Sequence, residues 1–229
     1  MSIVQLMTWA RFLTRLSQPE ELQLTLAACL HRRAFIPPTE VWAVIEPTGG
    51  FLSAREAGFL FHAANTWPVA GPVIELGSYE GRSTLVFALA GRDVHAVDAW
   101  SLDIVEASDY QQIESSMETV RERFFANLRR AGVEARVTAH QGLTRQVAQH
   151  WTVPCAILFI DAGHSYEDVS NDLRLWTRFL LPDGLLIMHD VILHDHRDVT
   201  RAASELLPRG WRVIACAGSI VAFSQPTSR

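Results

Sequence analysis

The stretch Val73-Ile-Glu-Leu-Gly-Ser-Tyr-Glu-Gly-Arg-Ser-Thr84 decides the fold class, because it joins a short apolar run to a helix-like segment through a turn with two glycines. Further apolar runs of strand length follow it, and segments with helical spacing separate them. This alternation predicts a parallel sheet that helices cover on both faces. The last two strands are too close together for a crossover, so one must run antiparallel to the other. We therefore predict a doubly wound, Rossmann-like α/β fold.

The ends of the predicted elements carry the usual boundary signals, such as the capping box of Ser53 and Glu56. Strands are predicted at residues 73–76, 94–98, 135–140, 156–160, 185–188, 213–217 and 220–223. Helices are predicted at residues 53–66, 82–90, 114–130, 143–150, 166–181 and, capped by Asp195, up to about residue 207. Residues 1–50 show helical spacing at 3–16 and 22–30 but are too few to bury a core of their own. We predict an N-terminal helical extension at 1–50, acting as a lid or an oligomer contact, and one domain at 51–229.

Composition excludes several classes of protein. The 229 residues are 48% hydrophobic and 20% charged, which is typical of a globular chain and excludes a disordered one. The net charge of −5 argues against nucleic-acid binding through a global basic field. No apolar run reaches the roughly 18 residues of a membrane span, and the N-terminus lacks the order of a signal peptide. Cys29, Cys155 and Cys216 are far apart in apolar surroundings, which predicts reduced thiols and a cytoplasmic protein.

The carboxyl ends of the strands are the candidate site, because open α/β sheets bind ligands there. Tyr79 stands where a dinucleotide-binding loop has its middle glycine, and its side chain would block a pyrophosphate. Glu75 would repel a diphosphate and suits a ligand with an ammonium group. Asp98 lies 21 residues after Gly77, about the spacing at which a carboxylate reaches ribose hydroxyls; a cap is the alternative. A ribose, an ammonium group and no bridging phosphate are features of S-adenosylmethionine.

Together with Val94-His-Ala-Val-Asp98, the opening stretch resembles the first two motifs of class I S-adenosylmethionine-dependent methyltransferases. Two later stretches, Leu158-Phe-Ile-Asp-Ala-Gly-His-Ser-Tyr166 and Leu180-Leu-Pro-Asp-Gly-Leu-Leu-Ile-Met-His-Asp-Val191, resemble the branch with macrolide sugar O-methyltransferases and cephalosporin-hydroxylase-like proteins. The resemblance covers about residues 53–224. It implies a seven-stranded sheet of order 3-2-1-4-5-7-6 with strand 7 antiparallel. Trp100 is expected to stack on the cofactor unless it belongs to the core. The cofactor contacts that we expect from the resemblance are Glu75, Gly77, Ser78, Tyr79, Gly81, Ser83, Thr84, Asp98, Ala99, Trp100, Gln141, Gly142 and Asp161.

The same resemblance implies how the reaction proceeds. Asp161 and Asp190 end neighbouring strands, and they are expected to hold Mg²⁺ together with hydroxyls of the acceptor; the alternative is that both are hydrogen-bonded strand-end residues without a metal. The macrolide enzymes tend to carry two consecutive acidic residues where this chain has His189-Asp190. An imidazole suits a softer metal, or none, so His189 is a metal candidate that departs from the pattern. The resemblance places the catalytic groups at Asp161 and His164, with His164 as general base; a cap on the next helix is the alternative for His164.

The sequence thus predicts an S-adenosylmethionine-dependent O-methyltransferase. Its acceptor is expected to be a small molecule with hydroxyl groups, such as a sugar or a polyhydroxylated natural product, and no nucleic acid or membrane. A homodimer or larger homo-oligomer is expected. Residues 101–112 are predicted to close over the substrate, and residues 194–198 to open a surface helix. Two other functions are considered: a nicotinamide-dependent oxidoreductase, which Tyr79 disfavours, and a non-catalytic cofactor-binding homologue, which the set of Asp161, His164 and Asp190 disfavours.

Overall fold

The computed structural model describes residues 18–100, 117–192 and 196–226. Its strands are β1 Val73–Leu76, β2 Val94–Asp98, β3 Val137–Gln141, β4 Cys155–Ile160, β5 Leu180–Met188, β6 Arg212–Ala217 and β7 Ile220–Ser224. Its α-helices are α2 Pro19–Leu30, α3 Thr39–Ile45, α4 Ala54–Thr66, α5 Arg82–Leu89, α7 Met117–Ala131, α8 Thr144–Val147, α9 Tyr166–Trp176 and α10 Arg197–Ser204. Three predicted features lie outside the described residues: the helix at 3–16, the closing loop at 101–112 and the Asp195 cap.

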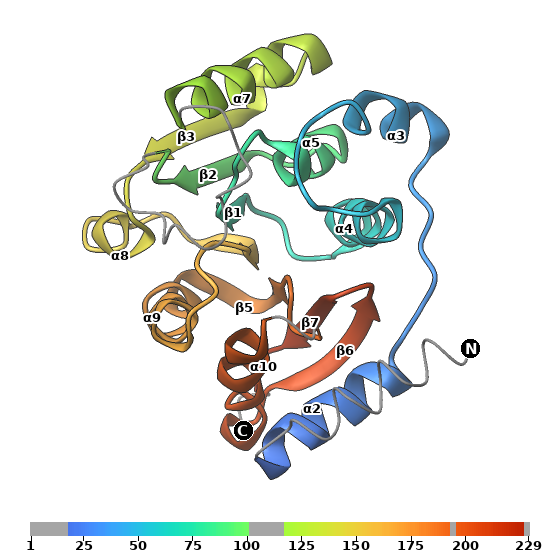
Figure 1. Ribbon diagram of the computed structural model, residues 1–229, viewed down its shortest axis with the longest axis vertical. Helices are drawn as coiled ribbons and strands as arrows, with labels where there is room; N and C mark the ends of the chain where they lie inside the picture. Colours follow the sequence, from blue (N-terminus) through green and yellow to red (C-terminus); the bar gives the residue numbers. More distant parts are fainter. Residues whose placement is uncertain (1–17, 101–116, 193–195, 227–229) are drawn as a thin grey trace.

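All of these strands form one seven-stranded sheet of order β3-β2-β1-β4-β5-β7-β6 (Figure 1). The first five strands pair in parallel, and β7 runs antiparallel to both β5 and β6. The predicted fold class and strand order are confirmed. In the register, Leu76 lies opposite both Val97 and Ile160, and Ile160 lies opposite Met188. Four strands therefore end at the same level, and the residues that follow them share one edge of the sheet.

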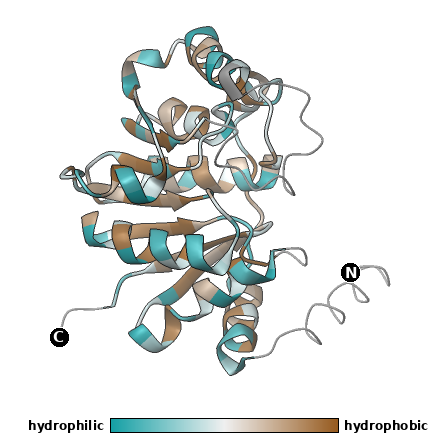
Figure 2. Ribbon diagram, turned by 60° about the vertical axis from the view of Figure 1, so that its left-hand side comes forward, coloured by the Kyte–Doolittle hydropathy of each residue, from teal (hydrophilic) through white to brown (hydrophobic). Residues whose placement is uncertain are grey.

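Two layers of helices cover the sheet. Helices α3, α4, α5 and α7 belong to one core cluster, whose largest fully buried side chains include Phe87, Phe124 and Phe159. Helices α2, α9 and α10 belong to a second cluster, which packs around Trp176 on the other face. Figure 2 shows the strands as a hydrophobic band between helices whose outer faces are largely hydrophilic. Among the described residues, every helix is too short or too polar to cross a membrane.

The prediction for residues 166–188 was wrong in detail. The helix ends at Trp176 instead of continuing to 181, and β5 already begins at Leu180. Pro182, which directly follows the predicted helix, lies within the strand. The strand tolerates it because the pairing with β4 changes register between Cys155 and Ile157, so the ladder is interrupted there.

The described part of the N-terminal extension packs on the domain. Helix α2 contacts α10 and β6, and it buries Leu24 and Ala28 in the second core cluster. Helix α3 contacts α5 and buries Ile45 on the opposite face. In Figure 1 the segment that connects these two helices runs along the outside of the molecule. A role of residues 1–50 as a lid or an oligomer contact stays a prediction.

Candidate functional site

The turn between β1 and α5 is the first part of the site. Its backbone is left-handed at Gly77, Tyr79 and Gly81, with φ angles of 85°, 48° and 89°. At Gly77 the backbone also lies against the end of β4, since a Cβ there would be 2.0 Å from the Asp161 carbonyl oxygen. Both the conformation and the available space therefore require glycine at residue 77. The close approach brings the glycine turn and the end of β4 together, as the topology predicted.

Asp98, at the end of β2, holds this turn in place. Its Oδ2 accepts the backbone N–H groups of Ser78 and Tyr79, both at 2.8 Å, and its Oδ1 accepts the N–H of Trp100 at 2.8 Å. Burial raises the pKa of the Asp98 carboxyl, although these amides favour its charged form. Asp98 was interpreted either as a ribose contact or as a helix cap. The structure shows a capping role, but the carboxylate caps the loop after β1 instead of a helix. A contact with ribose stays a prediction.

Trp100 belongs to the core, which was the alternative to stacking on the cofactor; a contact with the cofactor stays a prediction. The side chain is 3% exposed, and its ring packs on Phe124 with centroids 4.9 Å apart. Its Nε1 donates to the carbonyl oxygen of Tyr79 at 2.9 Å. The residue adopts φ = 41°, which turns the indole inward beneath the glycine turn. Trp100 therefore supports the turn from the core side.

Glu75 lies at the centre of a buried hydroxyl cluster. Its Oε2 accepts from Ser78 Oγ at 2.9 Å and from Thr84 Oγ1, and the Ser83 hydroxyl also stabilises the carboxylate. Its Oε1 has no hydrogen-bond partner among the described residues. Burial raises the pKa of Glu75 to about 7, and the three hydroxyls only partly offset this effect. Glu75 thus places an unsatisfied carboxylate oxygen, buried like the rest of its side chain, beside the turn.

The raised pKa predicts how stability depends on pH. Between its ordinary value of 4.5 and about 7, Glu75 keeps a proton in the folded state that the unfolded chain releases, so its contribution is present below pH 4.5 and is lost as the pH rises to 7. We expect the free energy of unfolding to fall over this interval, with Glu75 contributing up to about 3 kcal/mol. Urea unfolding at pH 5 and pH 7.5 measures it. The Glu75→Gln variant should lose this part and keep the part due to Asp172, whose pKa burial also raises to about 7. An equal fall in both proteins would contradict the prediction.

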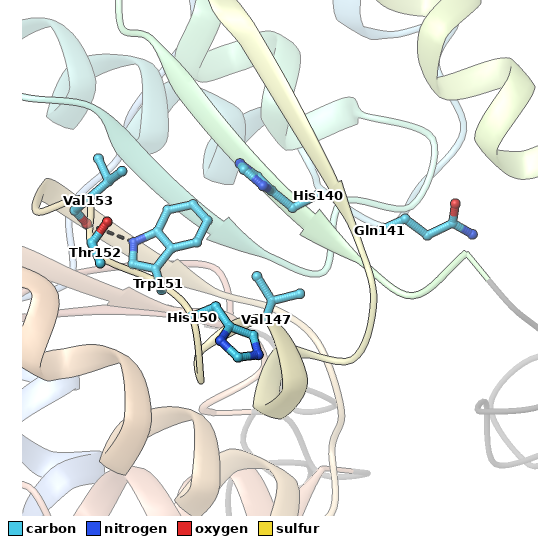
Figure 3. Close-up of a pocket in the computed structure, with 7 residues that line it drawn as sticks. All are labelled: His140, Gln141, Val147, His150, Trp151, Thr152 and Val153. Carbon is cyan, nitrogen blue, oxygen red and sulfur yellow. Dashed lines mark hydrogen bonds between the residues drawn. The ribbon is translucent and has the colours of Figure 1, made fainter.

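Beyond β3 the surface is hollowed. A pocket of about 490 Å³ is lined by His140, Gln141, Val147, His150, Trp151, Thr152 and Val153 (Figure 3). In the figure the Gln141 side chain points away from the other lining residues. The next residue, Gly142, donates its N–H to the Asp98 carbonyl oxygen at 2.9 Å, which ties the end of β3 to β2. Gln141 and Gly142, both predicted cofactor contacts, thus lie beside a pocket and one strand away from the glycine turn.

His164, which follows β4, has its ring held between two side chains. Ser165, whose Oγ accepts the N–H of Asp168, caps α9, so His164 is free of the capping role that was its alternative. Its Nε2 lies 3.2 Å from Oδ2 of Asp190. The ring of His196 stacks on it with centroids 4.2 Å apart. His164 is therefore an imidazole oriented by a carboxylate, three residues after Asp161 in the chain.

His189 lies between three carboxylates. Its Nδ1 is 3.1 Å from Oδ1 of both Asp161 and Asp190, and its Nε2 is 3.7 Å from Oε1 of Glu56. Neither nitrogen makes an aligned hydrogen bond among the described residues, and the contacts are ion pairs when the imidazole is protonated. Burial lowers the pKa of His189, but the carboxylates outweigh it and hold the pKa well above its ordinary value. Conversely, although burial opposes it, the imidazoles lower the pKa of Asp190, and His189 helps to hold that of Glu56 at about 2.

Two contacts of the site, those of Glu56 and of His196, were not recognised from the sequence. Glu56 was interpreted only as part of a capping box, which it does form with Ser53, but its Oε1 also accepts the N–H and Oγ of Ser219 at 2.8 Å. His196 was assigned to a surface helix start, yet its ring reaches His164. No local sequence pattern predicts either contact, because each contact joins elements that are far apart in the chain.

The donor set does not fit Mg²⁺. The predicted ligands are Asp161, His189 and Asp190, whose ligand atoms lie within 4.8 Å of one another. Mg²⁺ strongly prefers oxygen ligands, and one of these three is an imidazole. Both carboxylate oxygens of Asp190 already face imidazole nitrogens, of His189 and of His164. The cluster therefore has the composition of a network of ion pairs.

Comparison with known proteins connects this site to one kind of domain. A family model described as a methyltransferase domain matches residues 74–191, which include the glycine turn, Asp98, Asp161, His164 and Asp190. The match thus spans half of the chain and the strand ends that form the candidate site.

Solved structures share the fold at low sequence identity. The cofactor-bound protein Rv0187 from MTB is 18% identical, with a TM-score of 0.60 over 92% of this chain and 98% of its own. An O-methyltransferase from Bacillus cereus, solved in complex with SAH, is 19% identical, with a TM-score of 0.58 over 81% of this chain and 89% of its own. CalS11, a calicheamicin methyltransferase, is 18% identical, with a TM-score of 0.55 over 91% and 94%.

Proposed function

The chain belongs to the family of methyltransferase domains, and from this premise we propose that it transfers the methyl group of S-adenosylmethionine to a hydroxyl group of a small molecule. One observation carries the proposal: the glycine turn at Gly77 lies against the backbone of Asp161, three residues before the oriented imidazole of His164. A cofactor held by the turn and an acceptor held by the imidazole would meet at this edge of the sheet. Much of the rate would then come from holding the reacting groups in line.

The chain's own groups divide the work of cofactor binding. The left-handed turn from Gly77 to Gly81 gives a ligand close access to backbone, and Asp98 keeps that turn rigid. Glu75, through its unsatisfied Oε1, would take the ammonium group. Gln141 and Gly142 lie beside the pocket that would accept the adenine. When bound, S-adenosylmethionine supplies a methyl group on a sulfonium, so a hydroxyl that loses its proton can attack the methyl directly.

His164 is the base in this mechanism. Asp190 faces Nε2, so that nitrogen carries the shared proton and the basic lone pair is on Nδ1. The charged carboxylate also stabilises the imidazolium that forms when the acceptor hydroxyl gives up its proton. Asp161, which lies next to the turn and is partly exposed, would contact the cofactor or the acceptor. A magnesium ion takes no part, because the predicted ligands do not suit it.

The acceptor is proposed to be a sugar or another polyhydroxylated natural product. CalS11, which the fold resembles, is a calicheamicin methyltransferase. That likeness and the sequence resemblance support the proposal for this chain. We also keep the proposals of a cytoplasmic homo-oligomer that binds neither nucleic acid nor membrane.

Calorimetric titration with the two cofactor classes tests the function. We expect S-adenosylmethionine and S-adenosylhomocysteine to bind at one site per chain and NADH not to bind, because Tyr79 occupies the place of a dinucleotide-loop glycine. Transfer of a labelled methyl group to a panel of sugars and glycosides would then find the acceptor. Binding of NADH without binding of S-adenosylmethionine would favour an oxidoreductase. Tight cofactor binding with no transfer to any hydroxyl compound would favour a non-catalytic homologue.

A further inference from the structure

The cluster at the ends of β4 and β5 holds an unusual density of buried charge. Glu56, His189 and Asp190 are 5%, 6% and 7% exposed, and Asp161 completes the ring of carboxylates. Buried carboxylates are costly unless a cation or hydrogen bonds compensate them. Two strand-end carboxylates that face one position would normally gather a divalent ion. Here that position is occupied by a nitrogen of His189, which is 3.1 Å from an oxygen of each.

A carboxylate also faces the other edge of the His189 imidazole. Glu56, from α4, reaches the opposite edge of the imidazole, so carboxylates face both nitrogens. Ser219, in the turn between β6 and β7, donates to Glu56 at 2.8 Å and reaches Oδ1 of Asp190 at 3.4 Å. A side chain at residue 218 would collide with Glu56, because a Cβ on Gly218 would lie 2.3 Å from Oε1. Three elements from distant parts of the chain thus fix these anions around one imidazole.

We propose that the imidazolium of His189 is a built-in cation, which stands between Asp161 and Asp190 in place of a divalent metal ion. While the imidazole is protonated, the protein itself supplies the positive charge that keeps the two strand-end carboxylates together. The charge arrangement is a property of the fold and does not depend on the proposed function. Only the effect of His189 on turnover rests on the proposed methyl transfer.

The built-in cation makes His189 a positioning residue for the base. It pairs with Oδ1 of Asp190, and the Oδ2 of the same carboxylate faces His164. Asp190 adopts a left-handed φ of 56°, a conformation that aspartate tolerates better than most side chains but that contacts must still select. Pairing with two imidazoles and Ser219 supplies that constraint. His189 therefore acts on the reaction by fixing the carboxylate that orients His164.

Metal binding to the purified full-length protein tests the proposal without any assay of activity. We expect no stoichiometric metal by mass spectrometry of the digested protein and no binding of Mg²⁺ or Mn²⁺ by calorimetry. EDTA and millimolar Mg²⁺ should leave the melting temperature unchanged. One tightly bound ion per chain, whose removal by EDTA lowers the melting temperature, would overturn the proposal whether or not the protein proves to be a methyltransferase.

Two variants make the test sharper. His189→Ala removes the cation and should lower the melting temperature by several degrees, and Mn²⁺ should restore part of the loss by pairing with the abandoned carboxylates. His189→Asp should gain binding of one Mn²⁺ per chain. The matched control is His95→Ala, since His95 is a half-buried histidine of the same sheet packed against His140 and Trp151. It should lower the melting temperature without any response to Mn²⁺. Equal Mn²⁺ responses in the two alanine variants would contradict the proposal, and if neither His189 variant folds, the measurements on the wild type still decide.

Discussion

Replacing His164 by alanine is expected to lower the turnover of methyl transfer by about 10²–10⁴-fold, the range over which a positioned general base contributes. The acceptor hydroxyl would then have to give its proton to water, without the imidazole that Asp190 orients at 3.2 Å. Binding of S-adenosylhomocysteine should change little, because it is Asp98, through the backbone N–H groups of Ser78 and Tyr79, that holds the glycine turn. Single-turnover transfer of a labelled methyl group measures the first effect, and calorimetry measures the second.

The control for this variant is His31→Ala. His31 is exposed at the end of α2, and its backbone N–H and carbonyl oxygen make hydrogen bonds with Ala27 and Cys216, which alanine can also make. The substitution should therefore leave both turnover and binding unchanged. A His164→Gln variant tests the chemistry further, since the amide can occupy the same space but cannot accept the proton. Undiminished transfer by either variant of His164 would show that the base lies elsewhere.

The topology rule explains why so much of the site could be predicted from the sequence. Once the strands were placed, Gly77, Asp98, Asp161 and Asp190 had to lie together, because each follows or ends a strand at the same edge of the sheet. Their roles were less predictable. Asp98 was expected to face a ligand, and the structure shows in addition that its carboxylate accepts the backbone N–H groups of Ser78 and Tyr79. A hydrogen bond between a strand-end carboxylate and a neighbouring loop leaves no trace in a sequence pattern.

Contacts between distant elements account for what could not be predicted. Glu56 reaches His189 from α4, and His196 reaches His164 across the end of β5. Trp100 looked like a ligand-stacking residue because it follows a strand end, yet a left-handed backbone turns it into the core. Each of these outcomes depends on side-chain packing, which the period of hydrophobic residues does not encode. The sequence shows that His189 stands where the macrolide enzymes tend to have an acidic residue. Only the structure shows that three carboxylates surround its imidazole.

Substitution of Gly77 by alanine is expected to abolish cofactor binding. The added Cβ would lie 2.0 Å from the Asp161 carbonyl oxygen and 2.5 Å from its carbon, and no side-chain rotation can relieve a clash with backbone. The turn cannot retreat easily either, because the Gly77 N–H donates to the Val97 carbonyl oxygen at 2.9 Å. We expect a loss of stability of about 2–5 kcal/mol from overpacking and from the left-handed φ, and at least about a 100-fold loss of affinity for S-adenosylhomocysteine.

Gly91 supplies the matched control that separates these two causes. It has nearly the same backbone angle, with φ of 90° against 85°, but a Cβ at Gly91 would meet no atom within 4 Å. Gly91→Ala should therefore cost only the conformational part, about 1–2 kcal/mol, and leave cofactor affinity unchanged. Denaturant unfolding and calorimetry on both variants measure the difference. If Gly77→Ala were no more harmful than Gly91→Ala, the contact between the turn and β4 would not be what holds the cofactor site together, and the proposed meeting of cofactor and base at this edge would lose its foundation.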